Sequence, residues 1–317
     1  MPRTGRRSCL SLCSLLLLGV LAWPLAAQRH SQPACELAAG GRAAVVRVLD
    51  AETLLLDDDS QVRLIGALAP RSPDLRNGAA PWPPEQRATA ALRGLVLGKT
   101  VELAYSGRRR DRYGRLLAHL FVERGGERIW VQGRLLSAGH ARAYGLPGSF
   151  ACMRELIAHE RAARDPETGL WSNAAYRARS AHRTRALMRN RNTYQIVTGT
   201  VADVAQTKAR TYLNFGRNWR TDFTAGIDKK VLAKHPEWAT TLAGLAGRRI
   251  EVRGWIEYRN GPYINVEDPY QIAVADEALP GATPPPRGPT MSGGRKRASP
   301  PGKQKHPARG EPGALDL

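Results

Sequence analysis

Short runs rich in valine, leucine and isoleucine, separated by turn residues, mark the part of the chain that follows residue 43. Such runs predict strands, because aliphatic side chains bounded by polar turns fit a half-buried sheet. The predicted strands are Val45–Leu49, Thr53–Leu56, Val62–Ile65, Thr100–Tyr105 and Leu116–Val122. The polar run at residues 57–60 predicts a hairpin turn between the second and the third.

Helical periodicity follows a proline-rich loop at residues 66–83. Pro84 and Glu85 suit the first turn of a helix, where a proline loses no hydrogen bond and an acid meets the positive end of the helix dipole. Apolar residues then recur at helical spacing. They are Ala88, Ala91, Leu92, Leu95 and Val96. Two further helices are predicted, near Val131–Ala138 and over Phe150–Arg164.

The second half of the chain has another pattern. An arginine-rich connector at 173–194 leads into residues 195–276, where short strands and one helical stretch predict a small β-barrel of the oligonucleotide-binding type. Those strands are Ile196–Val204, Thr211–Phe215, Thr224–Ile227, Arg248–Trp255 and Pro262–Val266, and the helical stretch is Lys229–Leu245. Residues 278–317 combine Pro, Gly, Lys and Arg without apolar periodicity, which predicts a disordered basic tail.

The N-terminal residues predict export. Arginines precede an apolar run that ends in small residues, which is the order of a secretory signal peptide over residues 1–27. The run also has about the minimum length for a membrane span, so the alternative is an uncleaved anchor through residues 8–27. We therefore expect a periplasmic or secreted protein, or one held at the inner membrane by this segment.

Two cysteines, Cys35 and Cys152, lie beyond the signal segment. In an oxidising compartment a pair of cysteines favours one disulfide, here between the segment before the first strand and a helix near the end of the first domain. The alternative is two unrelated buried thiols.

The net charge adds a partner class. The 317-residue chain carries 48 Lys and Arg against 28 Asp and Glu, a formal charge of +20. A surplus of this size favours a polyanion, either nucleic acid or an anionic envelope surface. The sequence contains no glycine-rich nucleotide loop and no zinc-ligand spacing, so we expect no nucleotide cofactor.

Three short motifs carry candidate chemistry: Asp50-Ala51-Glu52-Thr53, Arg63, and Asp111-Arg112-Tyr113-Gly114-Arg115. Hydrolysis of a phosphodiester needs positive charge at the phosphoryl oxygens, oxygen ligands for a divalent ion, and a base that activates water. Paired arginines and nearby carboxylates are the residue types that meet the first two needs.

In their order these motifs resemble the staphylococcal-nuclease (thermonuclease) family, over residues 43–172. The resemblance implies a mainly β, α+β fold: a five-stranded barrel of the oligonucleotide-binding type with packed helices. It implies that Arg63 and Arg115 clamp a phosphate and that Glu52, with Asp50, holds part of a calcium (Ca2+) site. The implied activity is that of a calcium-dependent endonuclease.

Two positions depart from the family's pattern. Leu68 stands where the family has its second calcium ligand, and Arg71 stands where it has its general base. A positioned base contributes about 10²–10⁴-fold to rate, so both losses predict weak hydrolysis. Asp74 or Glu85 is the alternative source of an acid. The alternative role for Arg63 and Arg115 is a structural ion pair with a nearby acid.

The second barrel interleaves aromatic and basic residues, the combination that stacks on bases and follows a backbone in single-strand binding. The candidate nucleic-acid-binding residues are Trp219, Arg220, Trp255 and Arg259, with Arg217 and Arg253 beside them. The alternative is that each aromatic residue belongs to the core.

Three hypotheses follow for the function. The first is an exported, calcium-dependent nuclease with a divergent site. The second is a protein that binds nucleic acid, or another polyanion, without cutting it. The third is a basic protein associated with the cell envelope.

Overall fold

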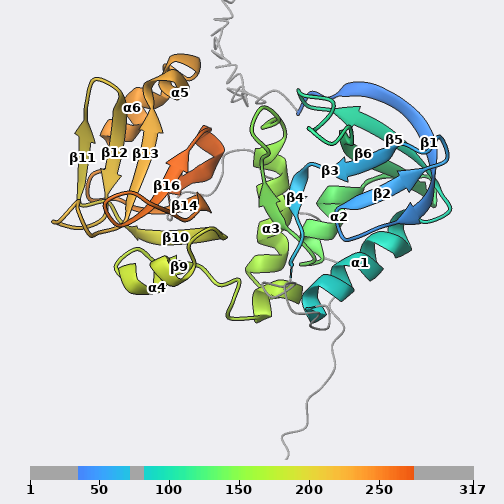
Figure 1. Cartoon of the computed structure of the whole chain (residues 1–317), viewed down its shortest axis with the longest axis horizontal. Helices are drawn as coiled ribbons and strands as arrows, with labels where there is room; N and C mark the ends of the chain where they lie inside the picture. The colour runs from blue at the N-terminus through green and yellow to red at the C-terminus, as the bar shows by residue number, and fades with distance from the viewer. Residues whose placement is uncertain (1–34, 72–81, 275–317) are drawn as a thin grey trace, which may run out of the picture.

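The computed structural model describes residues 35–71 and 82–274. The predicted signal segment, Asp74 and the C-terminal tail lie outside these residues. The described chain forms two groups of strands with helix α3 between them (Figure 1). No helix within the described residues is both long and apolar enough to cross a membrane.

The first group of strands is a closed barrel. Its sheet has the order β3-β2-β1-β5-β6-β7, and a parallel pairing of β3 with β6 closes five of these strands on themselves. The strands are β1 (Ala38–Val48), β2 (Thr53–Leu56), β3 (Gln61–Leu64), β5 (Thr100–Tyr105), β6 (Leu116–Arg124) and β7 (Glu127–Trp130). The predicted α+β fold with a five-stranded barrel is confirmed.

Three helices cover this barrel: α1 (Pro83–Val96), α2 (Val131–Ser137) and α3 (Met153–Arg164). The predicted apolar face of α1 is buried at Ala88, Leu92 and Val96. Helix α2 is tied to the strands by Gln132, which the sequence analysis did not single out. Its buried amide donates to the carbonyl of Ala118 at 3.0 Å and accepts from the backbone N–H of Leu120 at 3.1 Å.

Strand β4 (Gly66–Leu68), which pairs antiparallel with β8 (Arg142–Tyr144), occupies the first three residues of the loop predicted at residues 66–83. Each strand has three residues, too few for a periodicity in the sequence to reveal. Gly66 has a φ of +86°, and a Cβ there would lie 2.4 Å from the Leu156 side chain of α3. A glycine is therefore required where β4 passes against α3.

The second group of strands forms two sheets, ordered β17-β14-β10-β9 and β11-β12-β13-β16-β15. The strands are β9 (Arg179–Ser180), β10 (Tyr194–Thr200), β11 (Asp203–Gln206), β12 (Arg210–Asn214), β13 (Thr224–Asp228), β14 (Arg249–Trp255), β15 (Glu257–Tyr258), β16 (Pro262–Val266) and β17 (Ile272–Val274). They share one apolar core, which includes Phe215, Phe223 and Ile264. The pairings among the described strands leave two separate sheets, so a second barrel stays a prediction.

The helical stretch predicted at residues 229–245 is two short helices, α5 (Lys229–Lys234) and α6 (Trp238–Ala243). The predicted connector also differs from the structure, because residues 173–194 contain β9 and α4 (Thr184–Arg189). Leu187 of α4 is fully buried in the core of the second group. Ala181 is the other residue of this segment in that core, and so few apolar positions among arginines explain why the sequence pattern indicated a solvated linker.

Buried charges join the two groups. Arg253 of β14, with 3% of its side chain exposed, lies between Glu160 of α3 at 3.0 Å and Glu251 at 2.9 Å. The Glu160 contact has the distance of an ion pair but not the geometry of a hydrogen bond. Arg164 of α3 completes the network at 2.6 Å from Glu251. Arg253, expected on a binding surface, is therefore an interface residue.

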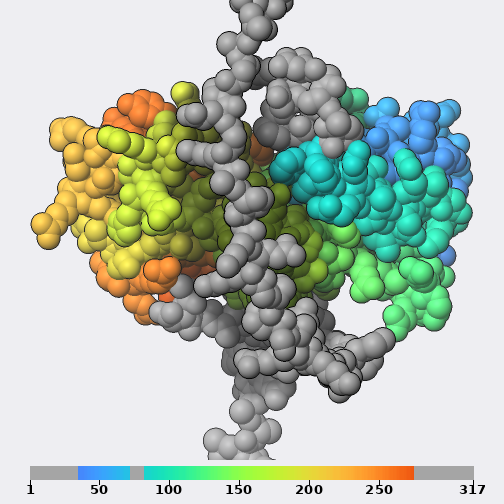
Figure 2. All heavy atoms as spheres, turned by 90° about the horizontal axis from the view of Figure 1, so that it is seen from below, coloured from blue at the N-terminus to red at the C-terminus, as the bar shows by residue number. Residues whose placement is uncertain are grey.

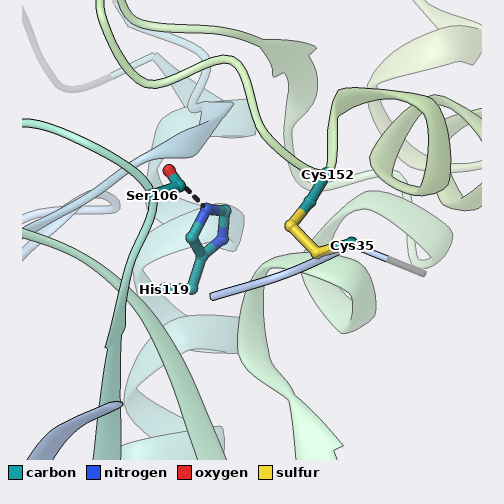
Figure 3. The surroundings of a disulfide bond; sticks show 4 residues. All are labelled: Cys35, Ser106, His119 and Cys152. Carbon is teal, nitrogen blue, oxygen red and sulfur yellow. Dashed lines mark hydrogen bonds between the residues drawn. A yellow bond between two sulfur atoms is a disulfide. The ribbon is translucent and has the colours of Figure 1, made fainter. Parts of the chain in front are cut away.

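The predicted disulfide between Cys35 and Cys152 is present and ties the segment before β1 to the start of α3 (Figure 3). The same surroundings contain His119, whose Nε2 lies 3.3 Å from the Ser106 hydroxyl. Burial lowers the pKa of His119 to about 4, so this ring is neutral at physiological pH. The two cysteines are 117 positions apart in the sequence, and the segment between them contains the whole barrel.

We expect the double substitution Cys35→Ser and Cys152→Ser to lower the free energy of unfolding by about 2–5 kcal/mol, because the open chain has more unfolded conformations to lose. Urea unfolding of the oxidised proteins measures this. Reduced wild type and the reduced variant should then coincide. Equal stability of the two oxidised proteins would mean that the bond does not form in solution.

The interface network predicts a pH dependence. Burial alone would raise the pKa of Glu251, but Arg253 and Arg164 lower it from 4.5 to about 2. A carboxyl with a lowered pKa stabilises the fold fully above its unfolded value, and this contribution is lost as pH falls through the folded value. Stability should therefore decline between about pH 4.5 and pH 2.

Glu251→Gln should lower stability at neutral pH and flatten that decline, as measured by urea unfolding across the pH range. Glu123→Gln is the matched control, since its carboxylate is 74% exposed and 3.9 Å from its arginine partner. An unchanged pH profile in Glu251→Gln would contradict the assignment.

Candidate functional site

The two predicted clamp residues lie on neighbouring strands. Strands β3 and β6 pair in parallel, with Val62 opposite Leu116 and Arg63 opposite Leu117. Because Val62 belongs to the barrel core and side chains alternate along a strand, Arg63 lies on the outer face, and Arg115, which directly precedes β6, continues the same face. Their side chains are 25% and 22% exposed. The fold thus brings both arginines to one side of the barrel.

Arg115 is held by Asp111. Its Nε donates to Oδ2 of Asp111 at 2.8 Å, and Oδ1 of Asp111 accepts the backbone N–H groups of Tyr113 and Arg115. Burial alone would raise the pKa of Asp111, but these hydrogen bonds more than offset it and keep the pKa below its ordinary value. The guanidinium Nη atoms have no hydrogen-bond partner among the described residues. The ion pair therefore orients Arg115 and leaves donors for an anion.

Glu52 is the buried acid of the site, with 2% of its side chain exposed. Its Oε1 accepts the backbone N–H of Ala69 at 2.7 Å. Its Oε2 accepts Nη2 of Arg71 at 2.8 Å and lies 3.7 Å from Nη2 of Arg63. Both carboxylate oxygens are therefore occupied by groups of the chain itself.

Arg71 provides the positive charge closest to Glu52. The Glu52 carboxylate is the main cause of a raised Arg71 pKa, and the charges of Asp50 and Glu85 act in the same direction. Glu52 is the acid in direct contact with Arg71, at 2.8 Å.

The other two residues at the expected metal site, Asp50 and Leu68, have structural roles in the chain. Oδ1 of Asp50 accepts the backbone N–H of Glu52 at 2.7 Å, which closes the turn before β2. Leu68 is buried in β4 opposite Arg142. Within residues 35–71 and 82–274, no group of three or more His, Cys, Asp and Glu side chains is placed to hold a metal ion.

A polar hollow of about 340 Å³ lies beside Arg115. Arg110 and Arg115 line one part of it, and Asp58 and Asp59 of the β2–β3 hairpin line another. Asp58 is engaged in its own turn, where it accepts the N–H of Ser60 at 2.9 Å. The hollow could admit a phosphate group next to Arg115, although the two acids offset part of the positive charge.

The four residues predicted to bind nucleic acid lie on different elements of the second group of strands. Trp219 and Arg220 lie in the loop 215–223, with the guanidinium 4.3 Å from the centre of the Trp219 ring. Trp255, at the end of β14, contacts Tyr194 and Tyr144 of β8, at ring distances of 6.0 and 6.1 Å. Arg259 lies over the Tyr263 ring at 4.8 Å.

A closed five-stranded barrel that presents two arginines beside a buried acid is the arrangement that the sequence motifs predicted. Residues 61–173 match the family model for staphylococcal nuclease homologues. The chain is also similar to the thermonuclease of Staphylococcus hyicus, with 26% identity over 132 residues, which cover 41% of this chain and 75% of that protein. The chain therefore contains a staphylococcal-nuclease-like domain, which supports a nuclease-like function.

The ion pair of Arg71 with Glu52 gives a direct prediction. Arg71→Gln should release Oε2 of Glu52 from its closest counter-charge. We expect this variant to gain a weak affinity for calcium, on the order of 10⁻⁴–10⁻³ M, because few ligands would surround the ion. The double variant Leu68→Asp with Arg71→Gln should bind more tightly. Isothermal titration calorimetry with calcium chloride measures both.

Arg93→Gln removes the same charge from an exposed position on α1 and serves as the control. It should behave as wild type does. If wild type already binds calcium as tightly as Arg71→Gln, then Arg71 does not block the site.

Proposed function

We propose that this chain is an exported nucleic-acid-binding protein built on a nuclease-like fold. Arg63 and Arg115 hold a phosphodiester on the outer face of β3 and β6, and hydrolysis is absent or very weak. The proposal joins the family match, which implies nucleic acid, with the geometry of a site whose acids are already occupied.

The observation that carries the proposal is the pairing of Glu52 with Arg71. A catalytic cation needs free carboxylate oxygens, and both oxygens of Glu52 are taken by Ala69 and Arg71. Arg71 also cannot serve as a general base, because an arginine stays protonated at any physiological pH. Arginine forks bind phosphate through two-point contacts without needing either group.

Calcium, which the family implies, does not fit the residues that the structure describes. Calcium takes 6–8 oxygen ligands, and here Leu68 supplies none while Asp50 and Glu52 are engaged by the chain. Arg71 supplies one positive charge close to the buried acid instead. Binding of a phosphodiester should therefore be independent of divalent ions.

A second candidate function is a calcium-dependent endonuclease with an altered site. The family match favours it, as do the retained Arg63, Arg115 and Glu52. This activity would require that bound substrate displaces Arg71 from Glu52 and that another acid replaces the residue at position 68. The exposed Arg71 side chain, at 53%, has room for such a movement.

Export is part of the proposal and has two supports. The N-terminal segment has the order of a signal peptide or anchor. The Cys35–Cys152 bond is typical of an oxidising compartment. A periplasmic protein, a secreted protein and a protein anchored in the inner membrane with its domains outside would all be in an oxidising compartment.

A nuclease and retention assay on the purified mature chain tests the function. The substrates are labelled single- and double-stranded DNA and RNA, each with calcium and then with chelator. We expect no cutting, and retention that weakens steeply with salt and is unchanged by chelator. Arg115→Ala should weaken retention about tenfold, since one charge-assisted hydrogen bond contributes about 1.5–3 kcal/mol.

Arg93→Ala controls for the loss of net charge, and circular dichroism checks that each variant is folded. Calcium-dependent cutting that disappears in Arg115→Ala would establish the second candidate instead. If the protein neither cuts nor retains any strand, both nucleic-acid functions fail and the envelope hypothesis is left.

A further inference from the structure

A second basic hollow, of about 530 Å³, lies in the other half of the molecule. Three segments that are distant in the sequence form it: α4, the loop 215–223 between β12 and β13, and the turn that follows β15. Arg185, Arg189, Arg220 and Tyr258 are among the residues that line it. Helix α4 and helix α1 both lie on the face seen in Figure 2.

The hollow has an unbalanced positive charge. Its three arginines are exposed, no acid lines it, and none of the three forms an ion pair within the described residues. Arg71 and Arg253, in contrast, each lie against a buried carboxylate. Cations without a partner on the protein are the ones available to an external anion.

The walls of the hollow are fixed by the fold. Helix α4 is anchored by the fully buried Leu187. The loop 215–223 is closed by Asp222, which accepts the N–H of Asn218 at 2.9 Å. Gly261 has a φ of +108°, and a Cβ there would lie 2.8 Å from the carbonyl oxygen of Thr221. This glycine lets the turn and the loop meet, so the hollow exists before any ligand arrives.

Exposed aromatic rings accompany the arginines. The Tyr258 side chain in the lining belongs to a residue that is 63% exposed, and Trp219, beneath Arg220, is 49% exposed. A single exposed ring is common on a protein surface, but here two rings lie beside the same group of arginines. Rings that stack on bases, beside arginines that follow the phosphates, are the recognition chemistry of single-stranded nucleic acid.

We propose that this hollow is a second binding site and that it holds an unpaired nucleotide of a single strand. Arg185, Arg189 and Arg220 contact the phosphates, and the Tyr258 ring stacks on a base. The volume falls within the range of ordinary small-ligand sites, about 300–1,000 Å³. The inference rests on the proposed function in taking nucleic acid as the partner, and it adds a site remote from Arg63 and Arg115.

Binding of a fluorescent oligo-dT strand of about 16 nucleotides to the full mature chain, at several salt concentrations, tests the site. Arg185→Gln with Arg189→Gln should weaken binding at least about tenfold and reduce the salt slope by about 1.4, since each phosphate contact on a single strand contributes about 0.7. Tyr258→Ala should weaken binding about tenfold and leave the slope unchanged.

The control is Arg93→Gln with Arg124→Gln, which removes the same charge from exposed positions outside the hollow. Glutamine keeps a helix propensity close to that of arginine, so α4 should remain folded. Equal losses in this control and in the α4 variant would mean a general effect of net charge and would overturn the site. A normal affinity in Tyr258→Ala, with heparin competing as well as oligo-dT, would overturn the nucleotide assignment in favour of a simple polyanion surface.

Arg63→Gln with Arg115→Gln separates this inference from the proposed function. If those substitutions weaken binding while the α4 pair does not, the phosphodiester clamp stands and the second site fails. If only the α4 pair weakens binding, the second site stands and the clamp fails. A loss with each pair supports two sites on one strand-binding protein.

Discussion

The buried carboxylate of Glu160 is the interaction on which both halves of the molecule depend. It has no exposed surface, and it meets the N–H of Ala143 in β8 at 2.5 Å and Arg253 in β14 at 3.0 Å. A buried charge without its partner costs about 3–5 kcal/mol, so α3, β8 and β14 are held in one arrangement. Strand β8 pairs in turn with β4, and the chain leaving β4 carries Ala69 and Arg71 to Glu52. The second group of strands therefore supports the backbone of the nuclease-like site.

At that site the same physical rule acts on a different acid. Glu52 is as buried as a core residue and needs a counter-charge, which a divalent ion or an arginine can supply. The chain supplies Arg71, and the acids that would have ligated an ion are replaced or engaged in turns. The pair stabilises the folded site in the absence of metal and opposes the chemistry that a metal would bring. Arg63 and Arg115 can bind a phosphate without a metal ion and without disruption of the Arg71–Glu52 pair.

The sequence was sufficient wherever an element was long or its residue types were unambiguous. The barrel strands, α1, the disulfide and the positions of Arg63 and Arg115 were all predicted, and three strands (β2, β5 and β16) have the predicted bounds. Strands β4 and β8, of three residues each, and the six-residue helix α4 were missed because none of them carries an aliphatic run or a measurable period. The pairing of Arg71 with Glu52 was also missed, since it joins residues from separate elements. The sequence showed that Arg71 replaces an expected acid. It did not show whether the Arg71 side chain contacts Glu52 or faces a substrate.

The arginine content is a second case in which the sequence alone was not sufficient. A charge of +20 indicates a polyanion partner, but the sequence treats every arginine alike. The fold divides them: Arg71 and Arg253 neutralise buried acids, whereas Arg185, Arg189 and Arg220 converge without an acid beside an exposed tyrosine. An arginine without an acid beside it keeps its full positive charge for an external anion. The affinity of this protein for a nucleic-acid strand should therefore depend on the few arginines that keep donors for a phosphate, and much less on its total charge. These are Arg63 and Arg115 at the first site and Arg185, Arg189 and Arg220 at the second.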